Sequence, residues 1–294
     1  MNGVDGTHAN NRFRRGLLSS YFRSNIRTSL LPMHPAEFSK KVAFITGAGA
    51  GIGRSIAHEW ARCGGIGLLS DIDEEQVNRV ADEVKAMGAS AEAIKVDVRS
   101  LDDIRRGLSR AVALGGGLDV VFNVAGINIP KNVEHIEEEE WDAVVDTNLK
   151  SIYRTSKIAI PEMRQRGGGV IVNVASIAGI MAENRCGAYS ASKGGVVMLT
   201  RNMAMDFAKD NIRVNVICPG ATRTPRTEGY WKKSPTGKSE MAEMCPMKRA
   251  AEPEEIARPA VFLASSGASY ITGAALVVDG GMTAGFRIPT FDRI

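Results

Sequence analysis

Short apolar segments alternate with longer segments of helical periodicity from Lys41 to near the end of the chain. The apolar segments read KVAFIT, IGLLS, AEAIKV, LDVVFN, GVIVNVA, IRVNVIC and AALVVD. This alternation is typical of strand–helix–strand crossover units, whose strands run parallel. Strands that are apolar on every residue, such as VVF and VIV, are covered by helices on both faces. We therefore predict an α/β fold with a doubly wound parallel β-sheet of about seven strands, flanked by helices on both faces.

A glycine-rich loop joins the first predicted strand to the first predicted helix. It reads TGAGAGIG, at residues 46–53, and it opens the amphipathic segment IGRSIAHEWARCG. The amide groups and the dipole at a helix N-terminus favour a pyrophosphate there. We predict a Rossmann-type dinucleotide-binding fold that forms a single domain over residues 39–294. The loop residues predicted to bind the cofactor are Gly47, Ala50, Gly51, Ile52 and Gly53.

Two acidic positions extend the dinucleotide-binding pattern. Asp71 ends the second strand, 24 positions after Gly47, where such folds place the acid that holds the adenosine ribose hydroxyls. The pair Asp97 and Val98 follows the third strand, where the adenine edge would lie. A carboxylate repels a 2′-phosphate, and Ile72, which follows Asp71, offers no cation. We therefore predict that NAD is preferred over NADP.

The net charge excludes one class of partner. The chain has 37 Lys and Arg against 33 Asp and Glu, and residues 1–40 alone, with six basic and two acidic side chains, account for the excess of four. A balanced body offers no basic surface for nucleic acid. No apolar run approaches the roughly 18 residues that a membrane span requires. We expect neither nucleic acid nor a membrane as a partner.

Residues 1–38 are predicted to be a basic N-terminal extension that is either disordered or a targeting segment. The stretch NRFRRGLLSSYFRSNIRTSLLP is rich in Arg and Ser, as transit peptides are, whereas the opening MNGVDGTHAN is not amphipathic. A working start at Met33 is a further interpretation. The four cysteines are scattered without a CxxC pair, which favours a reducing compartment and no metal site. We expect a cytoplasmic protein, with a mitochondrial or plastid location as the alternative.

The chain resembles the short-chain dehydrogenases/reductases over nearly all of residues 40–283. The motifs that carry the resemblance are TGAGAGIG, NVAG at residues 123–126, Asn148 in DTNLK, Ser176 in NVASIAG, YSASK at residues 189–193 and PGATRT at residues 219–224. Val124 departs from the usual NNAG pattern of the family and leaves Asn123 in place. The resemblance implies an NAD(P)-dependent oxidoreductase acting on CH–OH groups. The further cofactor-binding residues that it implies are Asn123, Ala125, Gly126, Tyr189, Lys193, Pro219, Gly220, Thr222 and Thr224.

The predicted catalytic residues are Asn148, Ser176, Tyr189 and Lys193. Tyr189 and Lys193 are four positions apart and therefore share one face of a helix. A tyrosine ionises at about pH 10, so a base at neutral pH needs roughly 4 kcal/mol, which a nearby ammonium can supply. Ser176 can donate a hydrogen bond to the substrate oxygen as its charge develops. By resemblance, Asn148 holds a water that links Lys193 to solvent.

The predicted lid spans about residues 221–250 of the long irregular interval 220–251. Seven basic and three acidic side chains give it a positive balance, and Tyr230 and Trp231 suit a segment that closes over an apolar surface. The charge favours a secondary alcohol or ketone with polar or anionic groups, such as a polyol, sugar or hydroxy acid. A solvated lid without such a role is the plainer interpretation.

Three other functions fit parts of the sequence. They are a 3-oxoacyl-carrier-protein reductase, a cyclic diol or steroid-type alcohol dehydrogenase, and a non-catalytic nucleotide-binding protein. The intact Asn–Ser–Tyr–Lys set disfavours the last of these, and Asp71 disfavours a reductase that needs NADP. The resemblance also implies a homotetramer, with the helices at residues 141–166 and 189–209 and the tail after Gly281 as candidate contacts.

Overall fold

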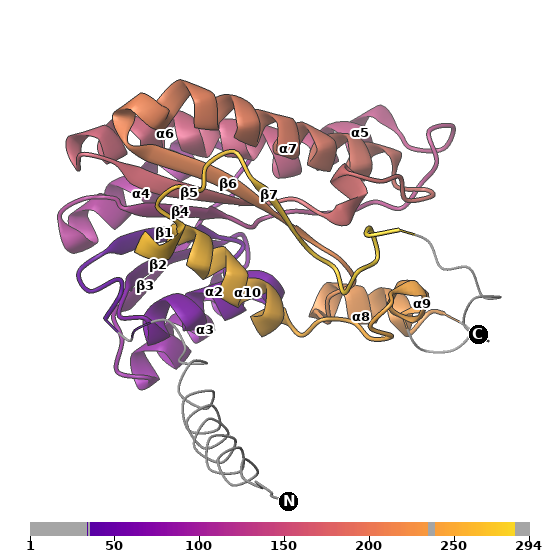
Figure 1. Ribbon diagram of the computed structural model, residues 1–294, viewed down its shortest axis with the longest axis horizontal. Coiled ribbons are helices and arrows are strands. Elements are labelled where there is room, and N and C mark those ends of the chain that lie inside the picture. The colour runs from indigo at the N-terminus through magenta and orange to yellow at the C-terminus, as the bar shows by residue number, and fades with distance from the viewer. Residues whose placement is uncertain (1–33, 35, 235–238, 286–294) are drawn as a thin grey trace, which may run out of the picture. The chain divides into compact units, whose positions relative to one another are not determined.

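Seven strands form one parallel sheet, in the order β3-β2-β1-β4-β5-β6-β7 (Figure 1). The computed structural model describes residue 34, residues 36–234 and residues 239–285. The strands are β1 (Val42–Thr46), β2 (Ile66–Asp71), β3 (Ala91–Lys95), β4 (Val120–Asn123), β5 (Gly169–Val174), β6 (Ile212–Pro219) and β7 (Ala275–Val278). Each predicted apolar segment therefore forms a strand, and the predicted doubly wound parallel sheet is confirmed.

Helices cover both faces of the sheet. Helices α2, α3 and α10 lie on one face, and α4, α5, α6 and α7 lie on the other (Figure 1). Their bounds are α2 (Gly51–Arg62), α3 (Glu74–Ala86), α4 (Leu101–Gly115), α5 (Glu138–Val145), α6 (Ser151–Gln165), α7 (Gly187–Phe207) and α10 (Pro253–Ala264). None of the helices in the described ranges is both long enough and apolar enough to cross a membrane.

The central strands are buried on both faces, as their continuous apolar sequences predict. Every residue of β1 and β4 is buried, and Trp60 on α2 packs edge-on against Phe122 of β4. On its other side, Trp60 stacks on Phe38 with 4.1 Å between ring centroids. Complete burial of such a side chain stabilises the fold by about 1.5–3 kcal/mol. The chain therefore packs onto this core from Phe38 onward.

The sheet order places one crevice at the carboxyl ends of the strands. The chain runs outward from β1 through β2 to β3, and then returns to β4 on the other side of β1. A crevice opens where the order reverses, and doubly wound folds bind their ligands there. Thr46, Asn123 and Val174 end β1, β4 and β5, so the residues that follow each strand meet at this crevice.

The lid contains regular structure that the sequence analysis missed. Helix α8 (Pro225–Trp231) and helix α9 (Glu240–Met244) lie within residues 220–251, so the prediction of an irregular interval was wrong in part. Thr224 begins α8 because its side chain accepts a hydrogen bond from the amide of Thr227, and proline follows at the first helical position. Residues 235–238 of the predicted lid, residues 1–33 of the predicted extension and the tail at 286–294 lie outside the described residues.

Candidate active site

A cleft of about 1520 Å³ opens at the carboxyl ends of the strands. Most of the residues singled out from the sequence line it together. They are Gly47, Ala50, Gly51, Ile52, Gly53, Asp71, Ile72, Asp97, Val98, Ala125, Gly126, Ser176, Tyr189, Lys193, Pro219, Gly220, Thr222 and Thr224. Asn123 and Asn148 do not line the cleft.

The glycine-rich loop forms a backbone cradle at one end of the cleft. Gly47 has a φ of +65°, and a Cβ at this position would lie 2.8 Å from the Cα and the amide nitrogen of Ala125. A Cβ on Gly53 would overlap the carbonyl oxygen of Gly47. Ala50 precedes α2 without a side-chain cap, so the first amide groups of the helix have no side-chain partner from this residue. These features fit a pyrophosphate held by backbone alone.

Asp71 lies beside this loop. Its Oδ2 accepts a hydrogen bond of 2.9 Å from the Gly49 amide, and its Oδ1 accepts one of 3.1 Å from the Asp73 amide. These bonds fix the carboxylate at the edge of the cleft, next to the cradle. A ribose diol can donate hydrogen bonds to such a carboxylate, whereas a phosphate ester at the same place would meet like charge.

Two arginines near this end of the cleft are already paired with carboxylates. The Arg54 Nε donates to Glu83 Oε2 at 2.8 Å, and Arg54 is therefore tied to α3, which carries Glu83. Arg99, which sequence analysis missed, lines the cleft and binds Asp97 through several hydrogen bonds, the shortest being 2.7 Å. These hydrogen bonds from Arg99 hold the pKa of Asp97 below its usual range. Both guanidinium groups are thus already paired with a carboxylate of the chain.

Ser176 and Tyr189 meet at the other end of the cleft. Ser176 follows β5 and begins a short 3-10 turn, Ile177–Gly179, while Tyr189 lies in the first turn of α7. The turn approaches α7 so closely that a Cβ on Gly179 would lie 2.7 Å from the carbonyl group of Lys193. Glycine at 179 therefore permits the approach that brings the Ser176 hydroxyl into hydrogen-bond contact with Tyr189.

Burial raises the pKa of the Tyr189 hydroxyl above its usual value. The positive charge of Arg226 opposes this rise most strongly, followed by the hydrogen bond with Ser176, and both favour the phenolate. Tyr189 is therefore a neutral phenol in the cleft at neutral pH, ready to donate a proton, and it needs nearby positive charge before it can accept one.

Lys193 is almost completely buried, with 3% of its surface exposed. Its Nζ donates a hydrogen bond of 2.8 Å to the carbonyl oxygen of Val174, and it lies 5.7 Å from the centre of the Tyr189 ring. Burial, and then the charge of Arg226, lower the pKa of Lys193 to about 7. Lys193 can therefore gain or lose a proton at neutral pH, whereas the sequence predicted a permanently charged ammonium group.

This burial predicts an unusual stability effect for Lys193→Met. The folded pKa of about 7 lies below the unfolded value of about 10.4, so the unfolded chain binds more protons between these values, and wild-type stability rises with pH there. We expect the variant without cofactor to be more stable than the wild type at pH 7, by about 1–3 kcal/mol after loss of the Val174 hydrogen bond.

Urea unfolding at pH 7 and pH 9 measures this difference. The advantage of the methionine variant is expected to shrink at the higher pH, because the wild-type chain gains stability as its unfolded lysine approaches its own pKa. A stability difference that is the same at both pH values would contradict the burial argument for Lys193.

The side chain of Asn148 holds two segments of the site together through hydrogen bonds. It has no exposed surface and lies in a π-helical turn, Asp146–Lys150, between α5 and α6. Its Oδ1 accepts a 2.8 Å hydrogen bond from the Ile127 amide, and its Nδ2 donates to the Ile127 carbonyl at 2.9 Å and to the Ser192 hydroxyl at 3.0 Å. Both amide donors are thus used to tie the segment after β4 to α7.

Asn123 is also turned away from the cleft. Its Nδ2 donates a 2.8 Å hydrogen bond to Asn173 Oδ1 on the neighbouring strand β5, and Asn173 in turn donates to the Thr200 hydroxyl of α7. This buried polar chain fixes the spacing of β4, β5 and α7. Any contact of Asn123 with a cofactor therefore comes from its backbone, and replacement of the neighbouring position by Val124 leaves this chain intact.

The threonines after β6 join the lid to the glycine-rich loop. Thr222 is buried, and its hydroxyl donates a 3.1 Å hydrogen bond to the carbonyl of Gly220. A Cβ on Gly51 would lie 3.0 Å from the Thr224 methyl group, so the base of the lid lies directly beside the pyrophosphate cradle. The lid and the cradle are therefore parts of one cleft.

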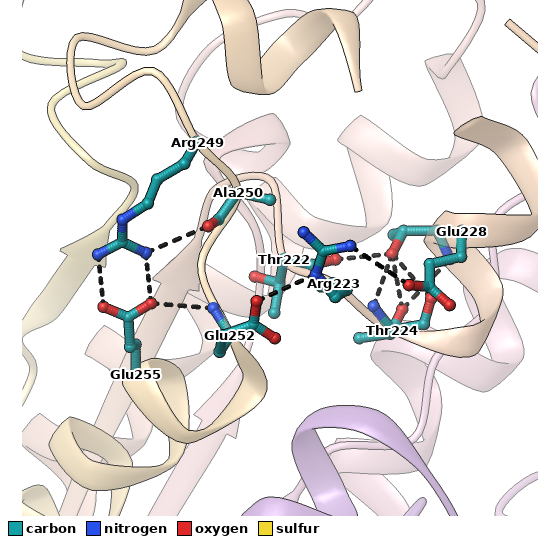
Figure 2. Close-up of polar contacts among 9 residues, drawn as sticks. Thr222, Arg223, Thr224, Glu228, Arg249, Ala250, Glu252 and Glu255 are labelled. Carbon is teal, nitrogen blue, oxygen red and sulfur yellow. Dashed lines mark hydrogen bonds and ion pairs between the residues drawn. The ribbon is translucent and has the colours of Figure 1, made fainter. Parts of the chain in front are cut away.

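Ion pairs hold the base of the lid in place (Figure 2). Arg223 binds Glu252 at 3.0 Å and Glu228 at 3.5 Å, while Arg249 binds Glu255 through two bonds, of 2.5 and 2.7 Å. Hydrogen bonding with Arg249 lowers the pKa of Glu255 to about 2. Two of the seven basic residues counted in the lid are therefore occupied by carboxylates of the chain itself.

One side of the cleft has polar residues that the sequence motifs did not indicate. Glu183 and Cys186 lie between the Ser176 turn and α7, and Asn128 donates a 3.5 Å hydrogen bond to the Cys186 thiol. Burial raises the pKa of the Glu183 carboxyl group. The only available signal was their position within a few residues of Tyr189 and of the NVAG motif. Elsewhere in the described residues, no group of three or more His, Cys, Asp or Glu side chains is arranged to hold a metal ion.

The sequence and the fold are both similar to known oxidoreductases. A family model described as Enoyl-(Acyl carrier protein) reductase matches residues 47–283. Oxidoreductase UcpA of Salmonella typhimurium is 39% identical over 253 residues, covering 84% of this chain and 96% of the relative. Cyclohexanol dehydrogenase of an Acinetobacter species is 38% identical over 248 residues, covering 84% of this chain and 96% of the relative.

A solved structure of levodione reductase superposes with a TM-score of 0.81 at 33% identity, covering 85% of this chain and 100% of the other. The motifs, the sheet order and these similarities agree with one another. The chain belongs to the short-chain dehydrogenase/reductase family of oxidoreductases, which use NAD or NADP.

Proposed function

We propose that this chain interconverts a secondary alcohol and a ketone by hydride transfer, with NAD as its preferred cofactor. The observation that carries the proposal is the joint position of Asp71 and Tyr189 in one cleft, with the glycine cradle beside Asp71. The carboxylate suits the ribose diol of NAD. The phenol suits proton exchange with the oxygen of a carbinol or carbonyl group.

NAD bound in this cleft supplies the hydride acceptor for alcohol oxidation, and NADH supplies the donor for ketone reduction. The cradle and the first amides of α2 would hold the pyrophosphate, and Asp71 would hold the adenosine ribose. Pro219, Gly220, Thr222 and Thr224 would border the nicotinamide end. Holding cofactor and substrate in one cleft in this way would remove much of the entropic part of the barrier.

Ser176 and Tyr189 act on the substrate oxygen. The Ser176 hydroxyl donates a hydrogen bond that strengthens as the oxygen becomes alkoxide-like. Tyr189 donates its proton to that oxygen during ketone reduction and takes the proton back during alcohol oxidation. Lys193, with a pKa of about 7, can pass a proton onward at neutral pH. Asn148 keeps α7 and the segment after β4 in the positions that this exchange requires.

The proposed substrate is polar or anionic, in the class of polyols, sugars or hydroxy acids. The wall formed by Asn128, Glu183 and Cys186 supports this, because these polar groups border the cleft near Tyr189. Asn128 Oδ1 is buried without a hydrogen-bond partner among the described residues, and an entirely apolar alcohol would leave it so, at a cost of about 1–3 kcal/mol.

A spectrophotometric panel tests the proposed function. Polar and neutral secondary alcohols are offered with NAD or NADP, ketones with NADH or NADPH, and absorbance of the reduced cofactor is followed. We expect turnover within the polar class and a higher kcat/KM with NAD. If NADH binds, as seen by its fluorescence, but no alcohol or ketone in the panel reacts, a nucleotide-binding function without catalysis replaces this proposal.

A further inference from the structure

Arg226, on the lid helix α8, reaches into the catalytic end of the cleft. Its Nη1 donates a hydrogen bond to the carbonyl oxygen of Gly126, a hundred positions earlier in the chain. A Cβ on Gly126 would lie 3.2 Å from Asn148 Oδ1 and 3.4 Å from Lys193 Nζ. The guanidinium group therefore lies close to the residues predicted to be catalytic, although Arg226 is an exposed residue.

Arg226 has no ion-pair partner among the described residues. Within the described part of the chain, the ion pairs at the base of the lid take up Arg223 and Arg249 but not Arg226. A guanidinium has several N–H donors in a planar fork that matches a carboxylate, and one carbonyl oxygen uses only part of it. Arg226 borders the same cleft as Tyr189.

The effect of the Arg226 charge on the pKa values of Tyr189 and Lys193 agrees with this location. Its charge is the largest influence that lowers the pKa of Tyr189, and it also contributes to the low pKa of Lys193. Both effects place the guanidinium charge close to these two side chains. An anion bound between Arg226 and Tyr189 would meet this field directly.

The adjoining wall offers polar partners, and Arg185, which lies in this wall, also lines the cleft. Asn128 Oδ1 is buried without a hydrogen-bond partner among the described residues, and the Tyr230 hydroxyl donates a 3.3 Å hydrogen bond to the Asn128 carbonyl. Glu183, the acid on this wall, hydrogen-bonds with Cys186. The wall can thus bind hydroxyl groups of a substrate, while α8 supplies the guanidinium group that lies at Gly126, beside Asn148 and Lys193.

We propose that Arg226 is a specificity-determining residue that binds a carboxylate group of the substrate beside Tyr189. This inference rests on the proposed function and narrows it to hydroxy acids and the corresponding oxo acids. The carboxylate replaces the Gly126 carbonyl as the partner of the guanidinium, and the carbinol carbon of the same molecule lies toward Tyr189. The competing explanation is that Arg226 only holds the lid in place through its hydrogen bond to Gly126 and does not bind the substrate.

Matched substrates separate the two explanations. The pairs are gluconate with glucitol, and 4-hydroxycyclohexanecarboxylate with cyclohexanol, which differ in the carboxylate. For Arg226→Gln, we expect the ratio of kcat/KM for the acid to that for its neutral partner to fall by about 30–100-fold, mostly through KM. Arg226→Lys is expected to recover only part of the ratio, because an ammonium cannot bind a carboxylate through a planar fork. Lys232→Gln removes a neighbouring lid charge that does not line the cleft, and it should leave the ratio unchanged.

Binding of an unreactive anion gives a readout that does not depend on turnover. Cyclohexanecarboxylate and its amide are titrated calorimetrically into the NADH-loaded wild type and Arg226→Gln. The inference is supported if the wild type binds the acid more tightly than the amide and the variant loses this preference. This holds even if no alcohol in the panel is oxidised, because a lack of turnover counts against the proposed function and not against the binding of the carboxylate. If Arg226→Gln weakens the binding of the acid and of the amide equally, or if the wild type binds both equally well, the inference is wrong. Arg226 then only holds the lid in place through its hydrogen bond to Gly126.

Discussion

Tyr189→Phe is expected to lower kcat for the true substrate by about 10³-fold or more. Proton transfer by a positioned side chain contributes about 10²–10⁴-fold, and the phenylalanine lacks the hydroxyl that exchanges the proton with the substrate oxygen. The ring remains in the first turn of α7, so the fold and the cofactor cradle should persist. Steady-state oxidation with NAD, together with NADH binding followed by fluorescence, measures both parts of the expectation.

Tyr153→Phe is the matched control for this variant. Tyr153 lies exposed on α6, where its hydroxyl contacts only Lys157 among the described residues, and it does not line the cleft. We expect the control to keep wild-type kcat. Retention of full activity by Tyr189→Phe with unchanged NADH binding would remove Tyr189 from the chemistry and with it the proposed role of Ser176.

Asp71→Asn is expected to shift the cofactor preference toward NADP by about 10²-fold. Two unit negative charges about 5 Å apart repel by roughly 3 kcal/mol at an effective dielectric constant of about 20, which corresponds to about that factor. The amide keeps the shape of the side chain and can still accept the hydrogen bond from Gly49. The ratio of kcat/KM for NAD to that for NADP, measured with one alcohol, gives the shift.

Asp73→Asn serves as the control for Asp71. Asp73 is a nearby carboxylate that begins α3 and accepts a hydrogen bond from the Gln76 amide, and asparagine can cap a helix equally well. The control should leave the cofactor ratio unchanged. An Asp71→Asn ratio equal to that of the wild type would show that another feature of the cleft sets the cofactor preference.

The sheet and the cradle could be predicted because their signals are local. Each strand is a continuous apolar segment, since helices cover both faces, and TGAGAGIG stands directly between β1 and α2. Asp71 could be placed because the carboxyl end of β2 fixes its position at the edge of the crevice. Tyr189 and Ser176 meet because α7 and the end of β5 converge there.

The charge states at the site could not be predicted, because they depend on packing between distant segments. Lys193 is buried beside Gly126, which follows β4, and Val174, which ends β5, and this burial lowers its pKa to about 7. Arg226 was one of seven basic residues in the lid by sequence, and only the fold distinguishes it from Arg223 and Arg249. Spacing in the chain carries no information about which cation finds a carboxylate.

The two motif asparagines have structural side-chain contacts that the sequence did not indicate. Asn123 and Asn148 were expected at the cofactor and in a proton relay, and the structure places both side chains in buried hydrogen bonds that join neighbouring elements. A motif records that a residue type is suitable at a position. It does not record whether the side chain or the backbone faces the ligand.

Hydride transfer from a deuterated alcohol tests the central claim most directly. A hydroxy acid that the panel identifies is labelled with deuterium at its carbinol carbon and incubated with the protein and NAD, and the reduced cofactor is analysed by mass spectrometry. The account predicts NADH that carries one deuterium from the substrate carbon, formed at a rate that collapses in Tyr189→Phe. Oxidation of the alcohol without deuterium in the cofactor would contradict it.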